Sequence, residues 1–182
     1  TDRLSFYLSL QDVRIWGDVP QLNSSDKNGI GRHHRNCQII GKNSRLLKVG
    51  RQEIMYDDQR IFGNVGWAQQ ARSHDAVRLE YSNSNLKIDL GFAFNQNGEN
   101  LTGTTLTTPG TYKSIQYLWA HNEWNKFSAS FLFLNNGLQF IDDTNPNNNE
   151  TRYSQTLGTH LNYKAKDLKL NSNLYYQFGK DE

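Results

Sequence analysis

The residues best suited to act on a solute lie in a single stretch of the chain, where arginines alternate with acidic residues. The stretch reads VGRQEIMYDDQRIFGNVGW from Val49 to Trp67 and QQARSHDAVRLEY from Gln69 to Tyr81. A guanidinium presents a fork of donors that matches a carboxylate, so converging arginines would attract an anionic solute. The candidate solute-binding residues are Arg51, Glu53, Arg60, Arg72, Arg78 and Glu80.

The same arginines have a second interpretation. They could pair with nearby acids in a ladder that braces the wall of the fold, and the two roles can hold together. The sequence alone leaves both open. The candidate acidic partners are Glu53, Asp57, Asp58, Asp75 and Glu80.

Other groups of reactive side chains give weaker indications. Ser73-His74-Asp75 contains three residue types of a catalytic triad, but adjacent residues cannot by themselves form the required geometry. No convincing second set forms around His121 or His160. The loop IDDTNPNNNE, 141–150, has oxygen ligands for calcium but lacks the spacing of a calcium loop, so a solvated loop is the simpler interpretation. We therefore predict a non-enzyme with no cofactor and no metal site.

The segment Gly29–Arg45, GIGRHHRNCQIIGKNSR, differs from the rest of the chain. It has no acidic residue, little alternation and the only cysteine. It could be a basic or metal-binding patch that uses His33, His34 and Cys37, or an irregular basic strand. A third interpretation is a local frame slip, which predicts that the segment pairs poorly with its neighbours.

The elements that must position these residues are β-strands. In Leu86–Phe94 the apolar residues occupy every second position, and Phe127–Phe133 and Leu168–Tyr176 alternate in the same way. Because side chains alternate along a strand, each segment has one apolar and one polar face. No comparable stripe with a period of 3.6 residues occurs. The chain is therefore predicted to be all-β, with antiparallel neighbours joined by tight turns at 82–85, 122–125 and 165–167.

The connections alternate in length. Short polar turns are separated by long loops rich in Asn, Gly and Thr, at 95–110 and 135–151. Aromatic residues gather at both ends of the strands: Tyr81, Trp124, Phe127 and Tyr163 beside the short turns, and Phe94, Tyr112, Tyr153 and Phe178 at the other end. This pattern is typical of an antiparallel up-and-down transmembrane β-barrel of a bacterial outer membrane. A soluble β-sandwich would not be expected to sort its loops by length so regularly; a soluble sandwich or a lipocalin-like barrel is the alternative fold.

Nine strands are predicted, near 3–16, 30–40, 45–56, 74–82, 86–95, 112–121, 126–135, 152–164 and 167–178. Bacterial single-chain barrels close with an even number of strands. The charged sequence GKDE also stands where a terminal strand should face lipid. Residues 1–182 are therefore expected to form a single domain that is an internal fragment of a larger barrel. Its open sheet edges would be a template for aggregation.

A membrane barrel assigns the charged residues to faces. An arginine that faces lipid near the midplane costs roughly 2–4 kcal/mol, so Arg51 is predicted to point inward, together with Glu53. Leu46 and Ile54 would then point outward. The stretch Gly63–Trp67 is too irregular for a plain strand and is expected to fold toward the lumen or the pore mouth. Two further pairs are predicted inside, Arg78 with Glu80 and Lys87 with Asp89.

A more specific pattern runs through Gln11–Gly17 (QDVRIWG) and Val49–Tyr81. Its elements are Gly-Arg-Gln-Glu, Asp-Gln-Arg, a Gly-Asn…Trp step and an Arg…Asp-Ala-Val-Arg strand, in that order. In these elements the chain resembles the alginate-export family of outer-membrane barrels, in its Bacteroidetes-like form. The resemblance is specific over Val49–Tyr81, weakens to a general barrel pattern over Asn85–Phe178 and fails over Gly29–Arg45. It implies a monomeric barrel of about eighteen strands with an arginine-lined lumen.

Composition and pattern together favour a passive pore. The net charge of +2 and the pI of about 8.6 are too mild to indicate a nucleic-acid partner. We predict a Gram-negative outer-membrane porin or exporter, in contact with outer-membrane lipid, that conducts an anionic polysaccharide or another sugar-like or anionic solute. The alternative is a structural or adhesive surface barrel whose long loops bind partners and whose lumen is plugged.

Overall fold

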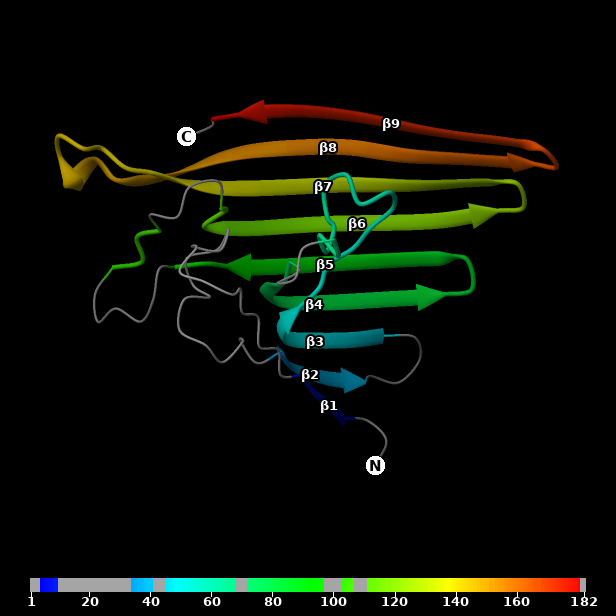
Figure 1. The fold of residues 1–182 in the computed structure, drawn as a ribbon, viewed down its shortest axis with the longest axis horizontal. Helices are drawn as coiled ribbons and strands as arrows, with labels where there is room; N and C mark the ends of the chain where they lie inside the picture. Colours follow the sequence, from blue (N-terminus) through cyan, green and yellow to red (C-terminus); the bar gives the residue numbers. More distant parts are fainter. Residues whose placement is uncertain are drawn as a thin grey trace.

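The protein folds as a single antiparallel sheet (Figure 1). The computed structural model describes residues 4–9, 34–40, 45–67, 72–96, 103–106 and 111–180, with only the backbone pairing described for the first two ranges. The strands are β1 (Leu4–Ser9), β2 (His34–Ile40), β3 (Arg45–Gln52), β4 (His74–Asn83), β5 (Leu86–Phe94), β6 (Ser114–Trp124), β7 (Phe127–Phe140), β8 (Glu150–Ala165) and β9 (Leu168–Gly179). A short 3-10 turn, η2 (Pro146–Asn148), lies between β7 and β8.

The topology is an up-and-down meander. Each strand pairs antiparallel with its neighbours in the sequence, in the order β1 to β9, which confirms the predicted all-β antiparallel arrangement. The hairpins β4–β5, β6–β7 and β8–β9 close through two-residue turns whose first residues, Ser84, Asn125 and Lys166, have positive φ. In the described ranges, no helix is both long and apolar enough to cross a membrane.

The segment with the least regular sequence does pair. β2 is bonded to β1 on one side and to β3 on the other, so the expectation of poor pairing is wrong for His34–Ile40. Backbone hydrogen bonds are the same for every residue except proline, and β2 contains no proline. The metal-binding hypothesis concerns His33, which lies outside the described residues, and the side chains of His34 and Cys37, which lie outside them as well.

One face of the sheet, here called the apolar face, exposes large hydrophobic side chains. The strand register aligns them in rows that run across the strands, for example Leu79, Leu90, Leu118, Phe133, Leu157 and Tyr176, each paired with the next. Phe133 is half-buried, and the other five side chains are exposed, from 36% for Leu118 and Leu157 to 69% for Tyr176. Soluble monomers rarely expose apolar patches of this extent.

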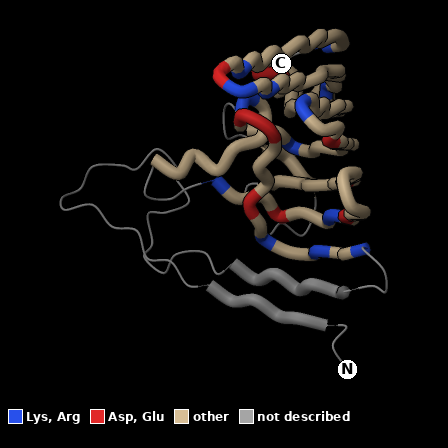
Figure 2. Tube along the Cα trace, turned by 90° about the vertical axis from the view of Figure 1, so that its right-hand side faces the viewer, with Lys and Arg blue, Asp and Glu red and all other residues tan. Residues whose placement is uncertain are grey.

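The opposite face, here called the polar face, is covered in part by the connection between β3 and β4. Residues Glu53–Trp67, here called the inner segment, cross this face of the sheet (Figure 1). Viewed from the short-turn end, the strands lie stacked one beside the next (Figure 2). The buried core forms where Ile54, Tyr56 and Phe62 of the inner segment meet the sheet residues Ala76, Ala93, Ile115, Tyr117, Trp119 and Leu132.

Candidate functional site: the inner segment and a polar hollow

The inner segment begins where β3 leaves the sheet. The Gln52 side chain donates from Nε2 to the carbonyl oxygens of Gly50 (3.3 Å) and Ala76 (3.0 Å) and fixes the last residue of β3. The chain then turns onto the polar face, so that Ile54 is fully buried and Met55 is 46% exposed. The alternation of an extended chain therefore continues past β3, although the sheet pairing has ended.

Tyr56 attaches the inner segment to the sheet. Its ring stacks on Trp119 at a centroid distance of 4.4 Å, and its hydroxyl donates to Asp89 Oδ2 at 2.6 Å. The hydroxyl also lies 3.1 Å from the hydroxyl of Tyr117. Burial raises the pKa of the Tyr56 hydroxyl, and the neighbouring Tyr117 adds to the shift. The group therefore remains protonated and serves as a donor.

A glycine makes room for this attachment. A Cβ atom on Gly91 would lie 2.2 Å from the ring of Tyr117, far inside van der Waals contact. Tyr117 stands opposite Gly91 in the β5–β6 register and is only 1% exposed. The missing side chain lets the tyrosine ring lie across β5, where it meets Tyr56 and Phe62 edge-on or tilted.

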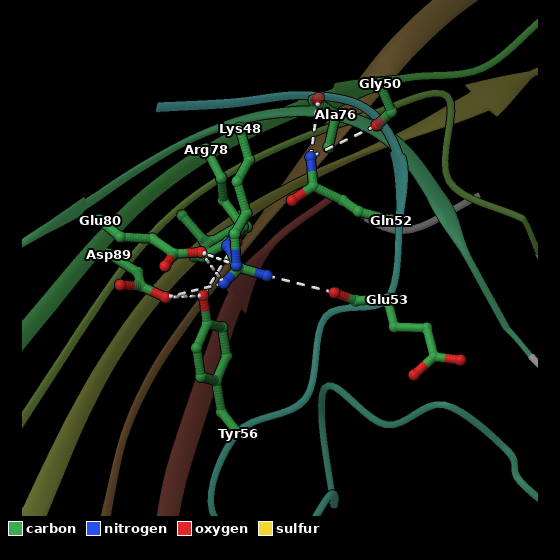
Figure 3. Close-up of polar contacts among 10 residues, drawn as sticks. Lys48, Gly50, Gln52, Glu53, Tyr56, Ala76, Arg78, Glu80 and Asp89 are labelled. Atoms are coloured by element: carbon green, nitrogen blue, oxygen red, sulfur yellow. Dashed lines mark hydrogen bonds and ion pairs between the residues drawn. The ribbon is translucent and has the colours of Figure 1, made fainter. Parts of the chain in front are cut away.

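An ion-pair network lies around the hydroxyl of Tyr56 (Figure 3). Arg78 pairs with Glu80 and lies 3.5 Å from the carboxylate of Asp89. Glu80 is shared, because Lys48 Nζ lies 2.9 Å from it. Arg78 also donates from Nη1 to the carbonyl oxygen of Glu53, at 3.1 Å. The guanidinium of Arg78 is thus committed to two carboxylates and to the backbone at the start of the inner segment.

The tip of the inner segment consists of Asp57 and Asp58, whose carboxylates point toward different strands. Asp57 accepts hydrogen bonds from Trp119 Nε1 (3.0 Å) on β6 and from the Ser130 hydroxyl on β7. Asp58 accepts from Asn173 Nδ2 (2.7 Å) on β9. A positive φ at Asp57 allows this divergence of neighbouring side chains. Burial opposes ionisation of Asp58, but the hydrogen bonds from Asn173 and from the backbone N–H of Arg60 together lower its pKa overall.

Beside this tip the polar face is hollowed. The hollow has a volume of about 400 Å³, within the usual range of small-molecule sites. Its walls come from the inner segment and from β5, β6, β8 and β9. The lining residues are Asp57, Asp58, Lys87, Trp119, His121, His160, Asn162 and Asn171. Among the described residues, Lys87, Asn162 and Asn171 form no side-chain hydrogen bond that would occupy their polar groups.

The predicted site residues do not all share one face. Arg51 pairs with Asp75, its direct partner across β3 and β4, through a 2.8 Å bond from Nε. That cross-strand pair lies on the face opposite to Gln52 and Ala76. The prediction that Arg51 and Glu53 share the inner face and pair is therefore wrong, because β3 ends at Gln52 and the chain leaves the sheet before Glu53.

Two apolar assignments also change. Leu46 stands opposite Glu80 in the register, on the polar face, and Ile54 is buried between the inner segment and the sheet, so neither points outward as predicted. Gly63–Trp67, expected to leave the sheet, belongs to the inner segment. Arg78 and Glu80 share the polar face and form an ion pair, as predicted.

The remaining candidates stand apart from that pair. Arg60 is exposed and lies 3.6 Å from Asp58. Arg72 is exposed, and its backbone N–H donates to the carbonyl of Asn64 at 2.6 Å. Basic and acidic positions are interspersed over the described strands (Figure 2). The described residues thus bring Glu53, Arg78 and Glu80 together, while Arg51 lies on the other face.

The histidines are held by neutral partners or by neighbouring acids. His74 Nδ1 lies 2.7 Å from the Tyr112 hydroxyl, on the face opposite to Asp75, so Ser73-His74-Asp75 does not assemble as a triad. His121 lies between Ser130 Oγ (2.8 Å) and Glu123 (3.2 Å), a grouping that sequence inspection missed.

The His121 grouping lacks an available nucleophile. Ser130 donates its hydroxyl proton to Asp57, so it cannot donate the same proton to the imidazole. The serine is also only 2% exposed. The grouping therefore anchors the inner segment and has no free hydroxyl with which to attack a substrate.

The acidic loop between β7 and β8 is organised by its own donors. Asp142 accepts from the backbone N–H and hydroxyl of Thr144, from the backbone N–H of Asn145 and from the side chain of Asn148. These bonds hold the pKa of Asp142 well below its usual range. They also occupy the oxygens that a calcium ion would need. No group of three potential metal ligands occurs among the described residues.

The residues of the hollow, apart from Asp57 and Asp58, were not among the candidates identified from sequence. They are the polar half of ordinary strand alternation, as in His160 and Asn162, or Asn171 and Asn173. Amides and imidazoles repeated on one face of neighbouring strands are the signal that could have found them. Comparisons of the chain with protein-family models, with curated proteins and with solved structures give no match.

Proposed function

We propose that the chain forms part of the wall of an outer-membrane β-barrel that conducts a polar solute. The observation that supports this most is the contrast between the two faces of one sheet. The apolar face exposes rows of Leu, Phe and Tyr, whereas the polar face carries charged and amide side chains. A barrel wall between lipid and an aqueous lumen requires this division.

The edges of the sheet support a larger barrel. Among the described strands, β1 and β9 each have one partner, and open strand edges are not tolerated within the hydrocarbon region of a membrane. Further strands, to a total of about eighteen, would cover both edges. Aromatic residues lie at the two ends of the strands, with Trp124 stacked on Phe127 at the short turn and Tyr176 stacked on Phe178 toward the other end. Such positions suit the two membrane interfaces.

The polar face favours a sugar-like solute over an anionic one. A cationic constriction needs arginines whose donors are free to meet a solute. Arg78 and Arg60 instead pair with acids of the polar side, and Arg51 pairs with Asp75 on the apolar face. The bracing role of these arginines is therefore better supported than anion attraction. An anionic polysaccharide, which the family resemblance implies, becomes the less supported cargo.

A plugged surface barrel is the second candidate function. The observation that favours it is the inner segment itself, which packs Ile54, Tyr56 and Phe62 against the face that would line the lumen. A segment fixed in this way narrows the lumen. If it closes the lumen entirely, the protein would have a structural or adhesive role and its long loops would contact partners.

Reconstitution of the complete protein into planar lipid bilayers tests these alternatives. We expect stepwise, voltage-independent conductance with weak ion selectivity. A protein that inserts, and shifts its gel mobility on heating as folded barrels do, but carries no current would support the plugged barrel. A protein that stays soluble and monodisperse without detergent would overturn the membrane proposal, because the apolar face would then have to be covered in some other way.

A further inference from the structure

We propose that the hollow is a binding subsite for one unit of an uncharged, polyhydroxylated solute, such as a neutral saccharide. This inference rests on the proposed pore function and assigns the substrate class within it. The hollow lies on the polar face, beside Asp57 and Asp58 of the inner segment. A solute that passes the inner segment would contact these residues.

The acceptors of the hollow are fixed in position before a solute arrives. Asp57 is held by Trp119 and Ser130, and Asp58 by Asn173. A carboxylate has about four lone-pair sites, so each retains capacity to accept bonds from hydroxyl groups. Pre-positioned acceptors avoid part of the ordering cost that binding would otherwise require.

The donors of the hollow have no side-chain hydrogen bond to another described residue. Asn162 and Asn171 are direct partners in the β8–β9 register, so their amides lie side by side. Each amide offers both donors and an acceptor, and Lys87 adds further donors on the opposite wall. A sugar hydroxyl donates and accepts at once, so neighbouring hydroxyls match this mixture better than a carboxylate or an ammonium group does.

The charge of the hollow disfavours anions. Two carboxylates, Asp57 and Asp58, and one ammonium group, Lys87, stand in its lining, while Arg60 lies outside the lining at 3.6 Å from Asp58. His121 Nδ1 lies 2.8 Å from Ser130 Oγ, and His160 Nδ1 lies 2.8 Å from Asn173 Oδ1. A uronic acid would therefore meet repulsion from the two aspartates that a neutral sugar does not meet.

The binding mode is expected to be hydrogen bonding without stacking. Both faces of the Trp119 indole are already covered, by Tyr56 at 4.4 Å and by His121 at 5.6 Å between ring centroids. Only its edge reaches the hollow. Polar contacts alone give weak binding, which suits passage, because a pore site must release its solute as readily as it captures it.

The test measures blockade of the ion current through the complete protein. Maltohexaose serves as the neutral probe and a galacturonate hexamer as the anionic probe. We expect maltohexaose to block at lower concentration than the uronate. Asn171→Ala and Asn162→Ala should each raise the half-blocking concentration of maltohexaose by roughly two- to tenfold, the effect of one lost hydrogen bond.

The control is Gln177→Ala, on the same strand and the same face as Asn171 but six residues away and outside the hollow. It should leave blockade unchanged. Stronger blockade by the uronate, or equal effects of all three alanine variants, would overturn the subsite. Absence of current would contradict the pore instead, and calorimetric titration of maltohexaose into the detergent-solubilised protein, wild type against Asn171→Ala, would then decide the subsite separately.

Discussion

Tyr56 controls whether the inner segment stays on the polar face, and its replacement gives a quantitative test. The side chain is only 8% exposed and contacts Phe62, Tyr117 and Trp119 through its ring. Replacing a buried aromatic residue by alanine costs about 3–5 kcal/mol. If that cost falls on the attachment, the ratio of released to attached inner segment rises roughly 100- to 4,000-fold in Tyr56→Ala, at 1.4 kcal/mol per tenfold.

The hydroxyl can be tested separately. Tyr56→Phe keeps the ring stacking and removes the hydrogen bond to Asp89. A hydrogen bond to a charged group contributes about 1.5–3 kcal/mol, so the released population should rise roughly 10- to 150-fold. Met55→Ala is the matched control, because Met55 is the preceding residue and its side chain is 46% exposed.

Trypsin cleavage at Arg60 measures the released population. The Arg60 side chain is 61% exposed, but the backbone around it is held in a tight loop, in which the N–H of Tyr56 donates to Phe62 and the N–H of Gln59 donates to Tyr56. When opening is fast relative to cleavage, the cleavage rate follows the population of the open state. We expect the fastest cleavage in Tyr56→Ala and slower cleavage in Tyr56→Phe. Met55→Ala and the wild type should share the slowest rate. Cleavage of Tyr56→Ala at the wild-type rate would refute the attachment.

Three further outcomes follow from the same contacts. Arg78→Glu should lower the heat stability of the barrel in detergent, by less than the about 3–5 kcal/mol of a fully buried pair because the side chains of Arg78 and Glu80 are 11% and 19% exposed, and leave ion selectivity nearly unchanged; a reversed selectivity with normal stability would restore the cationic constriction. Leu174→Arg, on the apolar face near the middle of β9, should reduce membrane insertion by roughly 2–4 kcal/mol, and Gln177→Arg on the polar face should not, as urea titration in lipid vesicles can measure. The pKa of Asp142 is lowered from 3.8, so the stabilisation of the loop by the ionised carboxylate is fully present above pH 3.8. This stabilisation is lost only as the pH falls through the lowered pKa. Hydrogen exchange should therefore find the loop 141–149 protected at about pH 4.5, and unprotected at neutral pH in Asp142→Ala.

The strands could be predicted because alternation is a local property. Each of the nine predicted strands overlaps an observed one, in the same order. The boundaries were less predictable at the long-loop end, where β7 runs on to Phe140 through Asn135, Asn136 and Gly137. Composition indicates a loop there, but Gln155 donates to the Asn135 side chain at 2.7 Å across β7 and β8. Cross-strand amide pairs support a strand where the residue types alone do not.

The inner segment could not be predicted from local pattern. Ile54 and Tyr56 continue the period of two that begins in β3, so alternation predicts a strand to residue 56. The partners that draw the chain out of the sheet are remote: Asp89 is 33 residues from Tyr56, and Trp119 is 62 residues from Asp57. Only the pairing of β4 to β7 into one sheet brings these partners together. Because the chain leaves the sheet after Gln52, Arg51 and Glu53 do not share a face.

The side chains of the arginine-rich motif in Val49–Tyr81 are thus engaged largely in contacts that stabilise the fold. Arg78, Glu80 and Tyr56 hold the inner segment against the sheet, and they cannot also recognise a solute without giving up part of that hold. Asn162 and Asn171, which have no side-chain hydrogen bond to another described residue, come from plain strand alternation. In a sheet with one polar face every second residue reaches that face, so each strand supplies several hydrogen-bonding groups without any motif. Recognition in such a pore is therefore expected from the strand amides, with the arginine-rich motif setting how far the inner segment narrows the path to them.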